Sequence, residues 1–398
     1  TTWDIDMINS NETGFTGEGV YIAVLDTGLA PNWKDYFPQD QIAAELGKGF
    51  KEICVWDKKV GDFVETGKMV ETTFIGDLGS THGTHVTSTI LGYNYYAPAD
   101  ALSGYPLPAI HIQGIAPDAI IIPIKVLADY QVPGSSGKVV FGTSDAVAAG
   151  INYATDLYLA GYSPMVITMS LGGPELSDVE KDAIDRAIDA GVIVVASAGN
   201  EGAEGMGYPG AYAPVISVGS CGWTKEWLNA EGNPFYRLWW LQSDFYDFND
   251  VPEDSVALAE QVYISDFSSR ELAGQELDIV APGSWVRGPY PGVPGYSHLP
   301  WWSNGWGWLV GRNPGNFYYL GGTSMSAPHV TGIVAQMLEK NPSLLQSEVE
   351  TILKTTALDI LPGSADIWDY SAAATITWDS DATGAGLVQA DLAVGAVP

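Results

Sequence analysis

The sequence is poor in positive charge. It has 17 Lys and Arg residues against 48 Asp and Glu residues, which gives a formal net charge of −31. Proteins that bind nucleic acid present a basic face to the phosphates, so this composition argues strongly against DNA or RNA as a partner. Charged residues make up only 16% of the chain, and extensive ion-pair networks of the hyperthermophile kind are therefore not expected.

Long apolar runs and cysteines are also scarce. No apolar run reaches the roughly 18 residues that cross a bilayer, so we expect no membrane-spanning helix. The first residues, Thr1-Thr2-Trp3-Asp4, do not resemble a signal peptide, and we expect that any export signal has been removed. The two cysteines, Cys54 and Cys221, could form one disulfide but are too few for a disulfide framework.

Short apolar runs alternate with helical patterns along most of the chain. Buried strands are expected at residues 20–25, 119–127, 165–171 and 192–196, with helices between them, and residues 177–180 form a capping box at the start of one helix. This rhythm predicts an α/β fold with a mostly parallel sheet and helices on both faces.

Three segments interrupt that rhythm, near residues 55–75, 222–263 and 289–316. The first contains two alternating runs around Thr66-Gly67-Lys68, which we interpret as a hairpin turn. Since no repeat or linker is evident, we expect a single domain, residues 1–398, with insertions at these three places.

Polar residues that could act in catalysis or metal binding stand at the boundaries of the expected strands and helices. Asp26 follows the strand at 20–25, where α/β sheets place functional groups, although a turn residue would look the same. His82 and His85 are spaced to share a metal ion, but no H-E-x-x-H pattern accompanies them, and a zinc site is disfavoured. Ser324 follows two glycines and a threonine at the start of a helix, as either a nucleophile or an N-cap would.

Five blocks of sequence stand in an order that resembles the subtilisin-like serine proteases (subtilases). They are Val24-Leu25-Asp26-Thr27-Gly28, His82-Gly83-Thr84-His85-Val86, Met169-Ser170-Leu171-Gly172-Gly173-Pro174, Ser197-Ala198-Gly199-Asn200-Glu201 and Gly322-Thr323-Ser324-Met325-Ser326-Ala327-Pro328-His329. The order acid, base, nucleophile differs from that of α/β-hydrolases, and the serine block lacks the closing glycine of their elbow. The histidine also speaks against sedolisins, which have Glu in its place.

The resemblance implies a subtilisin-like three-layer fold and a serine endopeptidase. It assigns Ser324 as nucleophile, His82 as general base, Asp26 as the acid that orients the imidazole, and Asn200 as an oxyanion donor. His85 and the later histidine, His329, are expected to be structural.

The resemblance also implies that peptide substrates are bound by strand addition. Two segments match the family's substrate-flanking strands, namely Ser136, Gly137, Lys138 and Ser170, Leu171, Gly172. Ala196, Ser197, Ala198 and Gly207 match walls of the pocket next to the cleaved bond. These small residues predict a roomy slot and a preference for large or apolar side chains on the acyl side of that bond.

Further properties follow from the resemblance alone. We expect a secreted monomer whose propeptide has been removed, polypeptide substrates, and no cofactor for catalysis. We also expect a structural calcium ion, because family members commonly bind one. Its candidate ligands are Asp244, Asp247, Asn249 and Asp250, and residues 379–384 resemble half a calcium loop, although Ala390 stands where its bidentate Glu belongs. Solvated acidic loops would look the same. The strands that would carry Cys54 and Cys221 lie about five strands apart in this fold, so both thiols should be free.

Two other functions remain compatible with the sequence. One is a non-catalytic peptide-binding homologue, which the intact set of Asp26, His82, Asn200 and Ser324 argues against. The other is a transpeptidase or macrocyclase on the same fold, for which the long insertions leave room. The aromatic residues of 289–316, among them Trp301 and Trp302, are expected either to form a wall of the substrate groove or to pack against 222–263.

Overall fold

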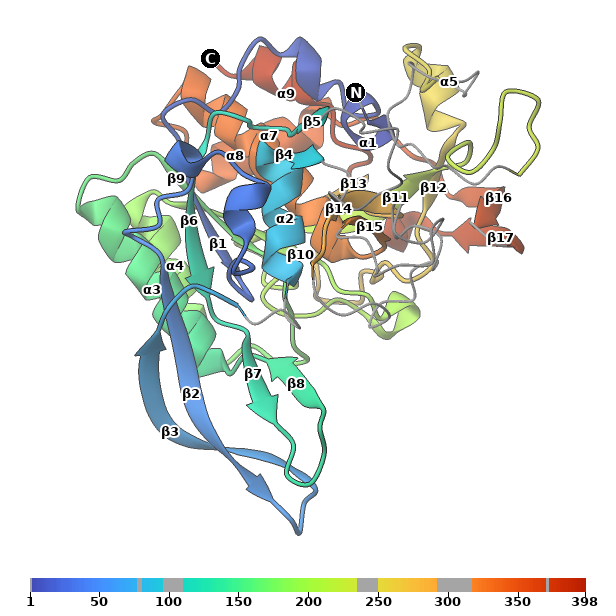
Figure 1. Ribbon diagram of the computed structural model, residues 1–398. Coiled ribbons are helices and arrows are strands. Elements are labelled where there is room, and N and C mark those ends of the chain that lie inside the picture. Colours follow the sequence, from blue (N-terminus) through green and yellow to red (C-terminus); the bar gives the residue numbers. More distant parts are fainter. Residues whose placement is uncertain (1, 77–80, 96–109, 235–249, 292–316, 370–371) are drawn as a thin grey trace, which may run out of the picture.

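A nine-stranded sheet lies at the centre of the molecule (Figure 1). The structure, a computed structural model, describes residues 2–76, 81–95, 110–234, 250–291, 317–369 and 372–398. The strand order is β12-β11-β10-β9-β1-β6-β2-β3, and β13 pairs with β11. The strands are β1 (Tyr21–Asp26), β2 (Lys48–Asp57), β3 (Asp62–Thr72), β6 (Ile120–Lys125), β9 (Met165–Met169), β10 (Ile193–Ser197), β11 (Ile216–Trp223), β12 (Val262–Ile264) and β13 (Ile279–Pro282).

The pairings in the middle of the sheet are parallel, and the antiparallel pairs β2–β3 and β11–β12 lie at its two sides. Parallel strands are buried on both faces, and their sequences therefore read as continuous apolar runs. In β1 every residue after Tyr21 is buried, and β9, β10 and β11 are buried throughout.

Helices cover both faces of this sheet (Figure 1). Helices α3 (Ser144–Leu159) and α4 (Asp178–Ala190) pack on one face, and α2 (His82–Leu91) and α7 (Thr323–Lys340) pack on the other. The part of the chain that the structure describes also contains α1 (Trp3–Asp6), α5 (Ser255–Ala259), α8 (Gln346–Thr356) and α9 (Ala390–Ala396). The expected three-layer α/β fold is confirmed.

In the described ranges, four two-stranded ribbons stand outside the main sheet. They are β4 (Gly92–Tyr95) with β5 (Ile110–Gln113), β7 (Ala128–Gln131) with β8 (Lys138–Phe141), β14 (Val286–Pro289) with β15 (Phe317–Leu320), and β16 (Gly363–Asp369) with β17 (Ala372–Trp378). Ribbon β7–β8 lies beside the long hairpin β2–β3, which extends away from the body (Figure 1). The rings of Phe63 and Tyr130 join the two, with centroids 5.5 Å apart.

The turn of the β2–β3 hairpin is not where the sequence placed it. Residues 58–61 form the turn, and Thr66-Gly67-Lys68 lies inside β3. There the register shifts opposite Glu52, and Gly67 has a φ of +70° and donates its N–H to the buried Glu52 carboxylate at 2.6 Å. Glycine marks a bulge here rather than a turn. Both features need the same left-handed backbone, so the residue type does not distinguish them.

Cys54 and Cys221 are both free, as predicted. Cys54 lies in β2 and Cys221 in β11, and β10, β9, β1 and β6 lie between these two strands. At about 4.8 Å per strand the two α-carbons are far beyond the roughly 7 Å that a disulfide tolerates.

The segments 222–263 and 289–316, which were expected to be insertions, are described only in part, since residues 235–249 and 292–316 lie outside the described ranges. Within the described part of the chain, none of the helices has both the length and the apolar character that a bilayer crossing needs.

Candidate active site

Asp26 is the last residue of β1, at the carboxyl edge of the sheet, and its side chain is fully buried. The carboxylate accepts a hydrogen bond from the N–H of Thr27 at 2.6 Å. Both of its oxygens also lie 2.9 Å from Nδ1 of His82. Because an ionised carboxylate only accepts hydrogen bonds, Nδ1 carries the proton and Nε2 is the free lone pair of the neutral ring.

Helix α2 presents His82 to Asp26 at its first residue. The helix approaches β1 so closely that a Cβ on Gly83 would lie 2.4 Å from the carbonyl oxygen of Gly28, so only glycine fits there. The N–H of Gly83 donates to Oγ1 of Thr27 at 2.9 Å, which fixes the helix start beside the carboxylate.

The surroundings of His82 shift its acidity in opposite directions. Burial alone would lower its pKa, but the charge of Asp26 and the hydrogen bonds to it outweigh this and raise the pKa above 6.5. The ring therefore holds a proton more readily than an exposed histidine does.

Ser324 lies in the first turn of α7, and its partner is the carbonyl of Ser170. The Ser324 hydroxyl donates to that carbonyl at 3.4 Å, and the Ser170 hydroxyl donates to the carbonyl of Ser324 at 2.8 Å. Leu25 of β1 is paired with Met169 of β9, so Asp26 and Ser170 are the next residues on two adjacent parallel strands. The sheet therefore holds the His82–Asp26 pair and Ser324 at neighbouring strand ends.

No hydrogen bond joins Ser324 to His82 among the described residues, since the serine hydroxyl faces Ser170 instead. Hydrogen bonds between a nucleophile and its base are often long without substrate and tighten only in the complex. Ser324 and the His82–Asp26 pair thus lie at the ends of adjacent strands, and the Ser324 hydroxyl is bonded to the Ser170 carbonyl.

Asn200 is held in place by Thr323, the residue before the candidate nucleophile. The Asn200 carbonyl oxygen accepts from the N–H of Thr323 at 2.9 Å and from its hydroxyl at 3.0 Å. This leaves the side-chain NH₂ group of Asn200 without a partner in the described part of the structure. The backbone N–H of Ser324 also makes no backbone hydrogen bond, as expected in the first turn of a helix.

A pocket of about 570 Å³, called the first pocket here, opens beside these groups. Ser324, Asn200, Ser197, Leu171, Gly172 and Gly207 are among the residues that line it. Ala196 and Ala198 are fully buried behind Ser197 and do not line it. Four of the residues named for substrate binding thus surround one cavity that also contains the candidate nucleophile.

The other segment named for substrate binding, Ser136, Gly137 and Lys138, lines neither the first pocket nor the pocket next to it. Lys138 begins β8, and Ser136 and Gly137 lie in the loop before it. Residues 140–142, a little further along the chain, line this pocket together with Leu171, Gly172 and Gly173.

Two further histidines are engaged structurally. His85 is fully buried and bonds through Nε2 to the carbonyl of Val286 at 3.1 Å, and burial lowers its pKa to about 3, which keeps the ring neutral. His329 bonds through Nδ1 to the carbonyl of Met325 at 2.7 Å and through Nε2 to Asp4 at 3.1 Å. Burial would raise the pKa of Asp4, but the hydrogen bond and charge of His329 outweigh it and lower the pKa.

The proposed calcium ligands are mostly outside the described ranges. This applies to Asp244, Asp247 and Asn249, while Asp250 is described and exposed. The aromatic residues of 292–316, including Trp301 and Trp302, lie outside as well, so their two interpretations remain predictions.

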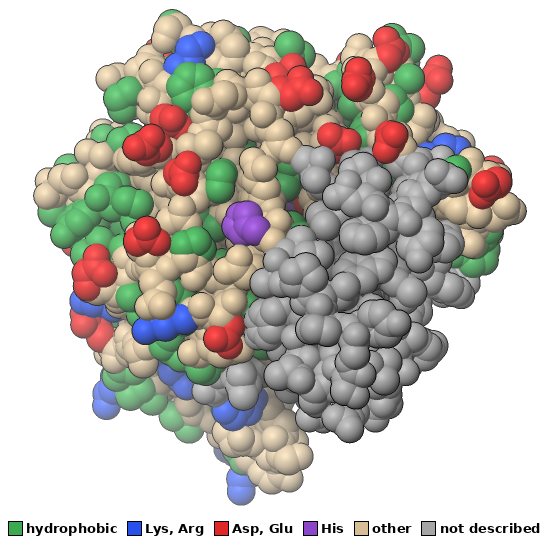
Figure 2. Space-filling model, turned by 45° about the horizontal axis from the view of Figure 1, so that its top comes forward, with side chains coloured by type: hydrophobic (Ala, Val, Ile, Leu, Met, Phe, Trp, Pro, Cys, Tyr) green, Lys and Arg blue, Asp and Glu red, His purple; other side chains and the backbone are tan. Residues whose placement is uncertain are grey.

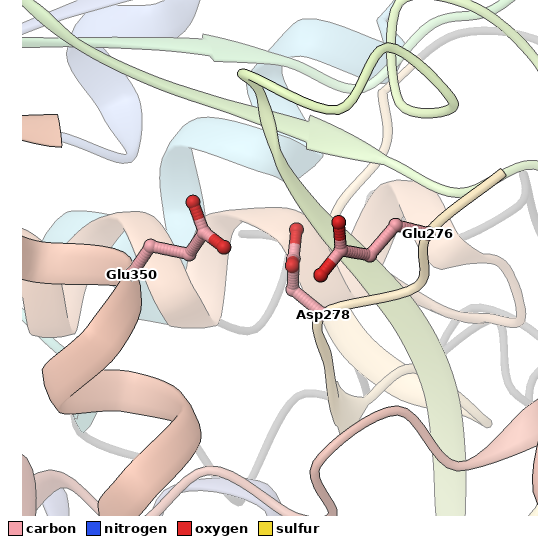
Figure 3. Close-up of side chains that lie close together, drawn as sticks. All are labelled: Glu276, Asp278 and Glu350. Carbon is pink, nitrogen blue, oxygen red and sulfur yellow. The ribbon is translucent and has the colours of Figure 1, made fainter. Parts of the chain in front are cut away.

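A different set of carboxylates does converge, and Figure 3 shows Glu276, Asp278 and Glu350 directed toward one another. One oxygen of each lies within 4.8 Å of the others, close enough to hold a metal ion. The ammonium group of Lys354 already contacts all three, at 2.5, 2.9 and 3.3 Å. The other oxygen of Asp278 accepts from the N–H and hydroxyl of Ser217. These donors fit an ion-pair network around Lys354 better than an oxygen cage for calcium.

Residues that position the candidate groups were largely missed in the sequence. Thr323 was read only as part of a motif, and its bonds to Asn200 have no signal in residue spacing. Among the described residues of the face in Figure 2, acidic side chains are spread over the surface with fewer basic ones among them.

Comparisons with protein families, with curated sequences and with solved structures all lead to subtilisin-like proteases. Residues 17–388 match the model of the subtilase family, peptidase S8. The chain is 30% identical to subtilisin DY of Bacillus licheniformis over 353 residues, which cover 87% of this chain and 86% of that protein. It is 29% identical to fervidolysin of Fervidobacterium pennivorans over 95% of this chain but only 41% of that longer protein. The solved structure of sphericase matches with a TM-score of 0.58 and 26% identity, over 98% of this chain and 97% of that one.

Proposed function

Because this chain belongs to the subtilase family of serine proteases, its substrates are polypeptides, and we propose that it cleaves them with a triad of Ser324, His82 and Asp26. The observation that carries this proposal is that His82 is bonded to both oxygens of the buried Asp26, at the end of β1. Ser324 is bonded to Ser170, at the end of the adjacent strand β9. Members of this family need no cofactor for catalysis.

In the proposed reaction, the Ser324 hydroxyl turns from the Ser170 carbonyl to Nε2 of His82 and attacks the scissile carbonyl carbon. His82 takes the hydroxyl proton and then gives it to the leaving amine. Asp26 keeps the proton on Nδ1 and stabilises the imidazolium that forms. An acyl-enzyme results, and a water molecule activated by the same histidine hydrolyses it.

Negative charge on the carbonyl oxygen is proposed to be stabilised by two donors. One is the free side-chain NH₂ group of Asn200, and the other is the backbone N–H of Ser324. Thr323 supports this role by fixing the orientation of the amide before substrate arrives, so that little reorganisation is needed during reaction.

The substrate is proposed to run as an extended strand past Leu171 and Gly172, with Ser136, Gly137 and Lys138, at the start of β8, on its other side. Main-chain pairing of this kind is largely independent of sequence, which supports broad specificity. The volume of the first pocket and its glycine-containing wall support a preference for large or apolar side chains next to the cleaved bond.

The remaining parts of the proposal are supported by similarity to subtilisins. We propose that the protein is a secreted monomer, formed as a single domain with three insertions and released from its own propeptide. We also propose a structural calcium ion, with Asp244, Asp247, Asn249 and Asp250 as ligands and residues 379–384 as a further candidate.

The test compares variants on a chromogenic peptide. Ser324→Ala should abolish turnover, and Asn200→Ala should lower kcat by about 10²–10³-fold, the loss typical of removing one oxyanion donor. Ser347→Ala, at an exposed position on α8, is the matched control and should behave as wild type. Full turnover in Ser324→Ala would overturn the proposal.

A further inference from the structure

A second pocket adjoins the first one. It has a volume of about 310 Å³ and shares Leu171, Gly172 and Gly173 with the first pocket, which contains Ser324. A peptide extended along these three residues from Ser324 would therefore pass over both pockets. The volume is at the low end of ligand sites, about 300–1,000 Å³, and suits one side chain better than a whole small molecule.

The second pocket has apolar walls and acidic groups. The apolar side chains are Leu127, Val140, Phe141, Val147 and Leu171. The acidic ones are Glu180, which is 5% exposed, and Glu175, which is exposed. No lysine, arginine or histidine lines the pocket in the part of the chain that the structure describes.

Helix capping does not account for the position of the Glu180 carboxylate. Ser177 caps α4 and accepts from the N–H of Glu180 at 3.2 Å, but the reciprocal bond of a capping box, from the Ser177 N–H to the carboxylate, is not made among the described residues. Ser144 is the one side chain whose hydroxyl lowers the pKa of this carboxyl group. The next cation along the helix, Lys181, is bound to Asp185 at 2.6 Å.

This leaves a buried acid with few donors. An ionised carboxylate can accept about four hydrogen bonds, and burial without them raises the pKa of Glu180 to about 7, with only the Ser144 bond opposing the shift. A cation that entered the pocket would supply the missing donors. The apolar walls would meanwhile cover the methylene stem of a long basic side chain.

We propose that the second pocket binds a lysine or arginine side chain of the polypeptide substrate and that Glu180 is the residue that selects it. This inference rests on the proposed protease function and adds a substrate class to it. The competing occupant is an apolar side chain, with a protonated Glu180 bonded to Ser144 beneath it.

The test uses peptides that are identical except at one position. Lysine, arginine and norleucine are placed in turn at each position on either side of the cleaved bond, and kcat/KM is measured with the full chain. Norleucine has the straight apolar stem of lysine without its charge. At one position lysine or arginine should be preferred to norleucine by about tenfold or more, the size of a hydrogen-bonded charge pair.

Variants then assign that preference to a residue. In Glu180→Gln the preference should fall to within about twofold at that position only. Asp178→Asn is the matched control, because it removes one negative charge from the same helical turn at an exposed position that does not line the pocket, and it should keep the preference.

Three results would contradict the inference. If wild type cleaves norleucine peptides as well as lysine peptides at every position, the inference fails while the protease function stands. A preference that survives Glu180→Gln belongs to other residues and overturns it too. If no peptide is cleaved by the folded protein, the proposed function itself fails. The wild-type comparison is decisive even if Glu180→Gln does not fold.

Discussion

Gly83→Ala is expected to damage activity without damaging the fold. The added methyl group would lie 2.4 Å from the Gly28 carbonyl oxygen and 3.1 Å from Cβ and Oδ1 of Asp26. Non-bonded heavy atoms are comfortable at about 3.5 Å and beyond, so the start of α2 must retreat from β1 by about 1 Å. That movement separates His82 from Asp26. Misplacements of about 1 Å cost on the order of 10²-fold in rate.

The assay measures kcat and KM on a chromogenic peptide together with thermal unfolding. We expect kcat to fall by about 10²-fold with KM little changed, because the segment at Leu171–Gly173 is not displaced. Gly395→Ala is the matched control, since Gly395 lies in α9 with nothing within 4 Å of an added Cβ. Alanine is favoured over glycine in helices by up to about 1 kcal/mol, so this control should keep full activity and melt no earlier.

Activity of Gly83→Ala within twofold of wild type would refute the reasoning. So would a loss of kcat that merely follows a smaller folded fraction.

Three further predictions concern charge. Activity needs neutral His82, and its pKa is raised, so kcat/KM should decline as the pH drops through a midpoint above 6.5. Asp26→Asn should lower that midpoint and cost about 10⁴-fold in kcat. A wild-type midpoint below 6.5 would contradict this prediction. Asp4→Ala leaves His329 buried without its partner and should cost about 3–5 kcal/mol in urea unfolding at neutral pH. That difference should shrink below pH 3.8, because the Asp4 pKa is lowered and the pair is lost on protonation; a difference independent of pH would argue against an ion pair. A chelator should lower the melting temperature if calcium is bound, and an unchanged melting temperature and protease resistance would rule the ion out.

The core of the fold follows from periodicity because parallel strands are buried on both faces. The run at 20–25 ends in Asp26, and the structure places that residue at the carboxyl edge beside Ser170. Which strand lies next to which could not be obtained from single runs of residues. The order β9-β1-β6 is seen only in the structure.

Local signals were ambiguous where one residue type serves two geometries. Gly67 fits a turn or a bulge equally well, and the buried carboxylate of Glu52, fifteen residues earlier in the sequence, decides for the bulge. Glu180 fits a capping box, yet it makes only one of the two bonds of that motif and lines a pocket together with residues of α3 and the loop after β9. Both errors arise from tertiary contacts that sequence spacing does not contain.

The central claim is that Ser324 is the nucleophile of a hydrolase, and the mass of the protein and its products tests it most directly. After treatment with a serine-directed phosphonate, we predict one label per chain, located on Ser324, and loss of peptide cleavage in proportion to labelling. In the untreated reaction each cleaved bond should add the mass of one water. A label on another residue with activity intact, or ligated products without added water, would contradict the account.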